Sequence, residues 1–308
     1  MWFWSLFSLL AVSSIQLIQA GGCDVAKPDF AAPGRRISEQ KCHEFNWERK
    51  HLEKCSLDAA NAKYPYMGAI GYRKKNDNSW TFLCGSFLIS KKFVVTAAQC
   101  AKVRDPDIST PEIVRFGNDN IKDEVPRLDV KILKTITHPE YKPPLKYYDI
   151  GLMELESEVP FSRSIYPACL WSQAALKGVE YAGNPAWGTD APHGKLRTVI
   201  AEMTVKVVDQ NTCLDTLKSQ DRYTRHFREL QEHHICANES ESYILNCQGS
   251  AGAPLITTLS LDGNSEDKMP YAFGVTSFGW RCGYLSIYTR VSSFIDWIEQ
   301  TVWPESKI

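Results

Sequence analysis

The chain has 308 residues, of which 44% are hydrophobic and 23% are charged. This composition excludes an intrinsically disordered chain, and the length fits one large domain or two domains of ordinary size. The 35 Lys and Arg residues almost balance the 36 Asp and Glu residues, so the formal net charge is -1. The charge gives no reason to expect binding to nucleic acid or to an anionic membrane surface.

Residues 1–20 form an apolar run that contains Trp2, Phe3 and Trp4 and ends on Ala20. Such a run with a small residue at its end is typical of a secretory signal peptide. No Lys or Arg precedes the apolar core, which departs from the usual pattern and leaves an uncleaved membrane anchor as the less favoured alternative. We therefore expect cleavage after Ala20 and an extracellular, secreted protein without a membrane span.

Ten cysteines are dispersed along the chain without the repeated Cys-x-x-Cys pair that would indicate a zinc site. An even, scattered set in a chain of this length predicts disulfides formed in an oxidising compartment. The cysteines are Cys23, Cys42, Cys55, Cys84, Cys100, Cys169, Cys213, Cys236, Cys247 and Cys282.

Residues 21–56 are polar and contain Pro28, Pro33 and Gly34, which predicts an extended, loop-rich leader segment too short to hold a core. From residue 57 onward, short β-branched and aromatic runs alternate with turn-rich stretches in two groups. This pattern predicts an all-β domain made of two barrels. The expected strands lie at residues 67–72, 81–89, 93–97, 113–116, 130–136, 150–155, 199–208, 254–258, 272–278 and 285–291.

The chain is expected to close on a helix that starts near Ser293. Ser293 and Asp296 have the spacing of a capping box. An apolar face then predicts that the helix docks on the β domain, and residues 304–308 form a tail. The residues of that face are Phe294, Trp297, Ile298 and Val302.

Two local features concern the surface. Asn238 begins an Asn-Glu-Ser sequon, which predicts a glycan on an exposed loop. His233 and His234, with His226 and Glu232 nearby, could bind a metal, but adjacent histidines point apart and no further ligands converge on them in the sequence. We expect a surface loop there, with no metal and no cofactor.

Several motifs occur in a fixed order: Cys84-Gly85-Ser86, Thr96-Ala97-Ala98-Gln99-Cys100, Asp149-Ile150-Gly151-Leu152-Met153, Pro167-Ala168-Cys169-Leu170, Trp187-Gly188, Cys247-Gln248-Gly249-Ser250-Ala251-Gly252-Ala253-Pro254, Ser277-Phe278-Gly279 and Tyr288-Thr289-Arg290-Val291. Together they resemble the trypsin-like serine protease family over residues 57–303. The resemblance implies an all-β fold of two antiparallel barrels with a cleft between them and a C-terminal α-helix.

The same resemblance implies that the catalytic triad is degenerate. The histidine position holds Gln99, whose amide cannot accept the proton of a serine hydroxyl, and the nucleophile position holds Ala251. Taking Ser250 as the nucleophile would break the spacing of the motif and would still leave that serine without a base. Asp149 alone remains, and we expect it to accept hydrogen bonds from the backbone and from Gln99. Loss of the serine or the histidine removes on the order of 10⁶ in turnover.

Substrate recognition and activation also depart from the family pattern. The pocket-floor position is Leu245, which would present an apolar wall to a basic substrate side chain. Family members are activated when a new N-terminus pairs with an Asp before the nucleophile. Here that Asp is replaced by Ser250, and residues 55–59 contain no Arg or Lys for activating cleavage. The resemblance therefore implies a domain without a zymogen switch.

The resemblance also implies disulfide pairings: Cys84 with Cys100, Cys213 with Cys236, and Cys247 with Cys282. Cys169 matches the position that tethers the segment ahead of the domain, so one of Cys23, Cys42 and Cys55 should bond to it and the other two to each other. Three connectivities remain open, of which Cys42 with Cys169 is favoured.

The leader around Arg36 resembles the linker of insect clip-domain and snake-like proteases. A clip knot needs six cysteines and only three precede the β domain, so a complete clip domain is absent. The Arg36-Ile37 bond resembles an activation site but lies far upstream of Ala59, and we interpret it as a solvated basic linker.

These features predict a secreted, catalytically inactive serine protease homologue that uses the protease fold as a binding scaffold. By analogy, its partners would be proteases, zymogens or substrates of an extracellular cascade such as insect innate immunity or melanisation. The alternative is a pattern-recognition or antimicrobial protein that binds microbial surfaces. The near-zero charge disfavours membrane attack. An active protease of unusual mechanism is the least favoured hypothesis.

Overall fold

The computed structural model describes residues 26–55, 62–103, 105–122, 127–189, 195–239, 250–261, 268–279 and 285–304. The expected signal peptide at residues 1–20 and positions 56–59 lie outside these residues, as do Cys23, Leu245, Cys247, Cys282 and residues 305–308. In the described part of the chain, no helix is long and apolar enough to cross a membrane.

The first half of the chain forms a closed antiparallel barrel with the strand order β1-β2-β3-β6-β5-β4. Its interior is filled by fully buried aliphatic and aromatic side chains such as Ile70, Phe87 and Val95. In β5, buried Val130 stands between exposed Asp129 and Lys131, as expected when alternate side chains face the core. The strands are β1 (Met67–Lys74), β2 (Trp80–Leu88), β3 (Phe93–Thr96), β4 (Ile108–Phe116), β5 (Leu128–Thr137) and β6 (Gly151–Leu155).

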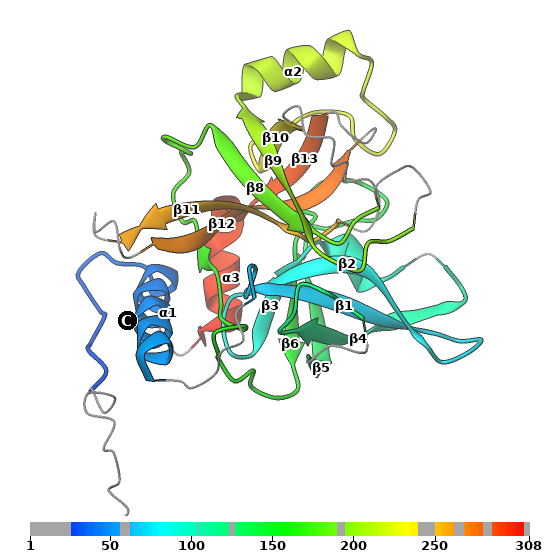
Figure 1. Ribbon diagram of the computed structural model, residues 1–308. Coiled ribbons are helices and arrows are strands. Elements are labelled where there is room, and N and C mark those ends of the chain that lie inside the picture. Colours follow the sequence, from blue (N-terminus) through cyan, green and yellow to red (C-terminus); the bar gives the residue numbers. More distant parts are fainter. Residues whose placement is uncertain are drawn as a thin grey trace, which may run out of the picture.

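The second half forms a seven-stranded sheet with the order β11-β8-β9-β10-β13-β12-β7. Because β11 also pairs with β12, six of these strands close into a second barrel, and β7 adds to β12 in parallel. Figure 1 shows the two barrels on either side of the middle of the molecule. The strands are β7 (Cys169–Leu170), β8 (Tyr181–Ala186), β9 (Ala201–Val208), β10 (His234–Glu239), β11 (Pro254–Ser260), β12 (Lys268–Gly279) and β13 (Leu285–Arg290).

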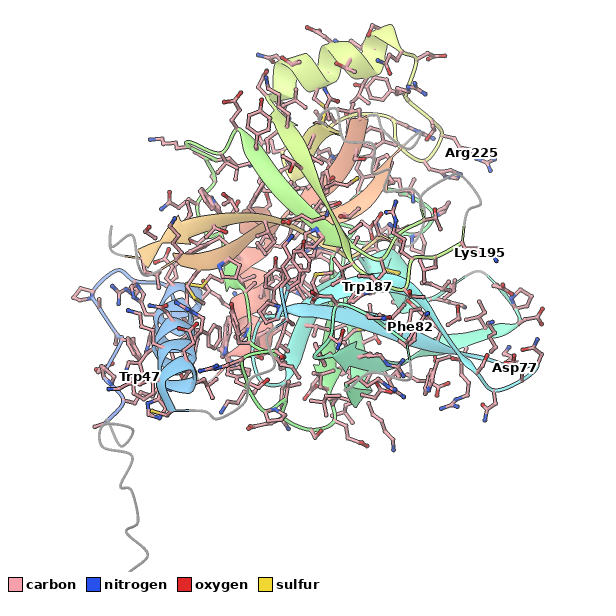
Figure 2. All side chains as sticks on the ribbon, viewed as in Figure 1. Trp47, Asp77, Phe82, Trp187, Lys195 and Arg225 are labelled. Carbon is pink, nitrogen blue, oxygen red and sulfur yellow. A yellow bond between two sulfur atoms is a disulfide. The ribbon has the colours of Figure 1, made fainter. Side chains whose placement is uncertain are left out.

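The predicted fold class is therefore confirmed, with two antiparallel barrels and a C-terminal helix. The barrels are joined by side-chain contacts as well as by the chain. Trp187 (Figure 2) follows β8 and is buried, and its Nε1 donates a hydrogen bond to the carbonyl oxygen of Asp119 at 2.9 Å. Asp119 follows β4, so this bond connects the second barrel to the first.

The helix α1 (Ile37–Cys55) replaces the extended leader that the sequence predicts, so that prediction is wrong. The inner side of the helix carries Ser38, Cys42, Phe45 and Asn46, whose three- and four-residue spacing matches one helical face. Cys42 forms a disulfide with Cys169 in β7. Ring packing adds to this covalent bond, because Phe45 meets Phe161 edge to face with 5.9 Å between the ring centroids.

Arg36, immediately before α1, is held by the C-terminal helix and does not belong to a solvated linker, so that interpretation is also wrong. Its Nη2 donates to Glu299 at 2.8 Å, and it forms a second ion pair with Asp296. The hydroxyl of Ser38 also donates to Glu299, at 2.6 Å. Figure 1 shows the resulting arrangement, with α1 alongside α3.

The C-terminal helix α3 (Ile295–Val302) follows a 3₁₀ turn, η3 (Val291–Phe294). The expected capping box at Ser293 is wrong, because the helix begins two residues later and Phe294 at its N-cap makes no side-chain cap bond. The apolar face packs against the barrels, with Ile295, Ile298 and Val302 buried. The 3₁₀ turn takes the place of the predicted first helical turn.

Short or polar elements were not expected from the sequence. The strand β8 contains Gly183, Asn184 and Pro185, which are poor strand formers, and β10 begins on a histidine. The helix α2 (Gln210–Ser219) starts at Asp209, whose carboxylate accepts hydrogen bonds from the N–H groups of Asn211 and Thr212. Pairing with neighbouring strands stabilises β8 and β10, and the Asp209 cap stabilises the start of α2. None of the three shows a clear apolar periodicity in the sequence.

Removing the Cys42–Cys169 disulfide should loosen the attachment of α1 to the β domain. This bond closes a loop with a sequence separation of 127 residues, so its replacement by alanines should lower the free energy of unfolding by about 2–5 kcal/mol. Limited trypsin digestion should then cut within α1, at Arg49, faster than in the wild type. The control is the Cys213→Ala/Cys236→Ala variant, which leaves α1 tethered; equal cleavage of α1 in the two variants would contradict this interpretation.

Candidate functional site

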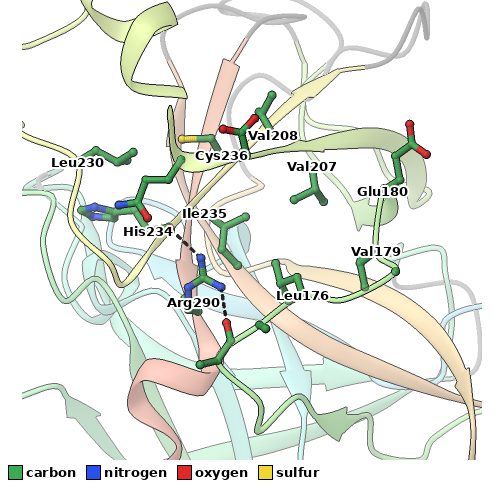
Figure 3. Close-up of a pocket in the computed structure, with 15 residues that line it drawn as sticks. Leu176, Val179, Glu180, Val207, Val208, Leu230, His234, Ile235, Cys236 and Arg290 are labelled. Carbon is green, nitrogen blue, oxygen red and sulfur yellow. Dashed lines mark hydrogen bonds between the residues drawn. The ribbon is translucent and has the colours of Figure 1, made fainter. Parts of the chain in front are cut away.

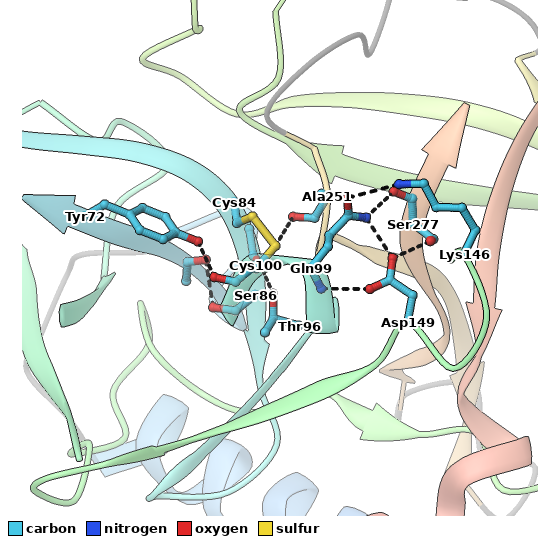
Figure 4. Close-up of a disulfide and its surroundings, with 12 residues drawn as sticks. Tyr72, Cys84, Ser86, Thr96, Gln99, Cys100, Lys146, Asp149, Ala251 and Ser277 are labelled. Atoms are coloured by element: carbon cyan, nitrogen blue, oxygen red, sulfur yellow. Dashed lines mark hydrogen bonds between the residues drawn. A yellow bond between two sulfur atoms is a disulfide. The ribbon is translucent and has the colours of Figure 1, made fainter. Parts of the chain in front are cut away.

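Gln99 lies in the 3₁₀ turn η1 (Ala98–Ala101) that follows β3. The turn closes when the N–H of Cys100 donates to the carbonyl of Ala97 at 3.0 Å. The Cys84–Cys100 disulfide anchors it to β2, and the Tyr72 hydroxyl donates to the Cys100 carbonyl at 2.7 Å. These bonds fix the position from which the Gln99 side chain projects (Figure 4).

Asp149 lies just before β6 and is almost completely buried, with 1% of its surface exposed. Its Oδ1 accepts a hydrogen bond from the backbone N–H of Gln99 at 2.9 Å, and its Oδ2 accepts one from Gln99 Nε2 at 2.7 Å. The Ser277 hydroxyl donates to Oδ2 at 2.5 Å. The carboxylate is therefore supplied with donors from both barrels.

Burial raises the pKa of Asp149 above its usual value. The hydrogen bonds from Ser277 and Gln99 and the nearby charge of Lys146 act in the opposite direction. The carbonyl of Asp149 is satisfied as well, because it accepts the Thr289 hydroxyl at 2.9 Å. This residue is thus a fully bonded part of the core between the barrels.

Both the nitrogen and the oxygen of the Gln99 side-chain amide have hydrogen-bond partners. Its Nε2 donates to Asp149 and also to the Ser277 carbonyl at 2.6 Å, so both N–H groups are engaged. Its Oε1 lies 3.5 Å from Lys146 Nζ. Gln99 connects η1 of the first barrel to β12 of the second, and an amide in this position cannot take up a proton near neutral pH.

Ala251 lies in the turn before β11, beside the Cys84–Cys100 disulfide (Figure 4). Its carbonyl accepts the N–H of Gly85 at 2.9 Å, and the N–H of Gly252 donates to the Thr276 carbonyl at 2.9 Å. The turn is thereby held between β2 and β12. Its side chain is a methyl group, which offers neither a nucleophile nor a proton.

Gly252 makes this close approach feasible. Its φ is +83°, and a Cβ atom at this position would lie 2.2 Å from both the Gly85 carbonyl oxygen and Thr96 Oγ1. Only glycine combines this left-handed backbone with such close packing. The structure therefore brings Gln99, Asp149 and the Ala251 turn into one tightly packed region.

The described disulfides are Cys42–Cys169, Cys84–Cys100 and Cys213–Cys236. Cys55 is also disulfide-bonded. Its pairing with Cys23 stays a prediction, as does Cys247–Cys282. Asn238 is half-buried in β10, where it pairs with both β9 and β13, so the expected exposed loop is wrong and its glycosylation remains untested.

His233 and His234 are buried, contrary to the expected surface loop. Burial lowers the pKa of His233 to about 4 and that of His234 to about 3, so both rings are neutral. The backbone N–H of Gln231 donates to His234 Nδ1, and His234 Nε2 lies 3.2 Å from the Lys146 carbonyl oxygen. Within the described residues, no group of three or more His, Cys, Asp or Glu side chains could hold a metal ion.

Ser277 and Lys146 contribute to the site but were not identified as site residues from the sequence. Ser277 belongs to the Ser277-Phe278-Gly279 motif, which marked a resemblance without indicating a contact with Asp149. Lys146 stands three residues before Asp149 in a segment without a motif. Its position next to Gln99 depends on how the loop before β6 folds.

Comparison with known proteins yields one family. A family model described as trypsin matches residues 56–298. The chain is 33% identical over 250 residues to serine protease Hayan of Drosophila melanogaster, covering 79% of this chain and 38% of Hayan. It is 29% identical over 300 residues to serine protease snk of the same fly, covering 88% of this chain and 66% of snk. It is 31% identical over 278 residues to phenoloxidase-activating enzyme of Bombyx mori, covering 78% of this chain and 58% of that enzyme. The chain thus spans less than two thirds of each of these relatives.

The turn at Gly252 should tolerate no side chain. The Gly252→Ala variant should lose about 3 kcal/mol or more in free energy of unfolding, because strain in the left-handed backbone adds to the clash with Gly85 and Thr96. Gly178→Ala is the matched control, with a φ of +77° and no atom within 4 Å of the added Cβ, and should lose about 1 kcal/mol. Urea unfolding measures both, and equal losses would show that the close packing at Gly252 contributes little.

Proposed function

The chain belongs to the trypsin family, and we propose that it is a secreted member without proteolytic activity that acts by binding other proteins of an extracellular protease cascade. In this proposal residues 57–303 form the protease-like domain and residues 21–56 the tethered leader. The observation that carries it is the pair of hydrogen bonds from the Gln99 side chain to Asp149 and Ser277.

The proposal of inactivity rests first on the general base. A trypsin-type mechanism needs an imidazole that hydrogen-bonds the aspartate on one side and takes the serine proton on the other. Gln99 occupies the place of that imidazole in the motif and meets Asp149, but its amide cannot take up a proton. Both of its N–H groups point to fixed acceptors, so it supports the fold of the site and not a proton transfer.

The proposal of inactivity rests second on the missing nucleophile. Ala251 occupies the serine position in a turn whose backbone is held by Gly85 and Thr276. Because this turn is fixed on both sides, the preceding Ser250 cannot move into the position of residue 251 without breaking these bonds. Ser250 is itself buried, with 5% of its surface exposed. In this proposal the replacement at either of the two positions is sufficient for inactivity.

Activation and substrate recognition fit the same proposal. Ser250 stands where the family has the Asp that receives the new N-terminus, and a hydroxyl cannot compensate a buried ammonium group as a carboxylate does. Leu245 at the pocket-floor position would not pair with a basic substrate side chain. A chain that performs no hydrolysis needs neither feature.

The proposed role in binding draws on the compartment and on the relatives. Residues 1–20 have the composition of a signal peptide, and the disulfides of the described domain suit an oxidising compartment. Phenoloxidase-activating enzyme is named for its action on another protein. We therefore infer protein partners of the same kind, namely proteases, zymogens or their substrates.

The purified chain should hydrolyse no peptide ester above background. The turnover should lie on the order of 10⁶-fold below that of an active family member, because both the base and the nucleophile are absent. The single variants Gln99→His and Ala251→Ser should stay inactive, since each restores only one part of a unit that works together. Wild-type hydrolysis that a serine-directed organophosphate abolishes would refute the proposal.

Crosslinking followed by mass spectrometry should identify the partners. When the tagged full chain is added to insect haemolymph, the crosslinked proteins should be enriched in serine proteases, their zymogens or their substrates. Bovine trypsin inactivated with an organophosphate serves as a control for binding to any protease fold. Recovery of microbial glucan or peptidoglycan fragments without proteases would instead support the pattern-recognition alternative.

A further inference from the structure

A pocket of about 710 Å³ opens on the second barrel, away from Gln99 and Ala251. Its walls come from the loop at residues 174–180, the end of β9, the start of β10 and Arg290 at the end of β13. The aliphatic side chains of Leu176, Val207 and Ile235 line part of it, and the Arg290 guanidinium lies beside Leu176 and Ile235 (Figure 3).

Arg290 is the only arginine or lysine that lines this pocket, and its charge meets no carboxylate among the described residues. It donates to three backbone carbonyl oxygens: from Nη1 to Ala174 at 3.1 Å, from Nε to Glu232 at 3.1 Å and from Nη2 to His234 at 3.5 Å. A guanidinium has five N–H groups, so two have no acceptor in the described structure. Partial burial lowers the pKa of Arg290, which reflects the cost of a charge without a counter-ion.

The two carboxylates that line the pocket are engaged elsewhere. Glu180 forms an ion pair with Lys206, with 3.5 Å between the charged atoms. Asp209 caps α2 by accepting the N–H groups of Asn211 and Thr212, each at 3.0 Å. Neither carboxylate bonds to Arg290, so the lining places a guanidinium without an ion-pair partner close to aliphatic side chains.

We propose that this pocket binds a peptide segment of a partner protein that carries one Asp or Glu side chain next to an aliphatic residue. The carboxylate accepts the two unused N–H groups of Arg290, a geometry in which guanidinium pairs with carboxylate in parallel hydrogen bonds. The aliphatic residue packs against Leu176 and Val207. In protein interfaces a few residues in desolvated pockets carry most of the binding energy, and arginine is common among them.

The lining favours a peptide over other ligands that carry a carboxylate. The loop at residues 174–180 exposes Ala175 and Gly178 at the rim, where their backbone groups can bond to a peptide main chain. A fatty acid has no main-chain groups that could form these bonds. A run of several acidic residues would be repelled by Glu180 and Asp209, so a single carboxylate fits best. The inference goes beyond the proposed function, because it holds whether or not the chain hydrolyses peptide bonds.

Binding of short peptides to the full chain tests the proposal. The probe is acetyl-Ala-Val-Glu-Leu-Ala-amide, and its matched control has Gln in place of Glu. Isothermal titration should give a dissociation constant at least about tenfold lower for the Glu peptide, because only its carboxylate pairs with the guanidinium. Hexaglutamate and octanoate should bind more weakly than the Glu peptide.

Variants place the binding in the pocket without disturbing the fold. Ala175→Asp introduces a carboxylate at the exposed rim of the pocket that Arg290 also lines and should weaken binding of the Glu peptide about tenfold or more. Gln173→Asp adds the same charge to the same loop outside the pocket and should leave the affinity within about twofold. The proposal is overturned by equal affinity for the Glu and Gln peptides, by equal effects of the two variants, by tighter binding of octanoate, or by no binding up to about 10 mM.

Discussion

One amide side chain holds the two barrels together at the point where a carboxylate is buried between them. Gln99 extends from the first barrel, and its Nε2 donates both to Asp149 and to the carbonyl of Ser277 in the second. A buried carboxylate is tolerated only when hydrogen-bond donors replace the water it has lost. An amide supplies these donors without a charge of its own, so the donor side of this junction does not titrate near neutral pH.

The turn around Ala251 is held in place by its backbone. Its position depends on backbone bonds to Gly85 and Thr276 and on the absence of a side chain at Gly252. None of these contacts involves the side chain of residue 251. The position of the turn therefore does not require a hydroxyl group at residue 251.

The sequence predicted the barrels well because their strands are rich in β-branched and aromatic residues. It failed for α1, whose inner side mixes Ser38, Cys42 and Asn46 with a single large apolar residue, so that its helical periodicity is weak. The Gln99–Asp149 contact could be foreseen because the motifs carry both residues. The pocket at Arg290 could not, since its walls come from segments between residues 174 and 290 that only the barrel brings together.

The bond between Cys42 and Cys169 has a practical consequence for the integrity of the chain. It encloses β1–β6, the whole first barrel, within one covalent loop with a sequence separation of 127 residues. A single backbone cut anywhere between these two cysteines leaves both pieces attached to each other. Such a nicked protein keeps its mass and its size under non-reducing conditions, and only reduction of the disulfide reveals the two fragments.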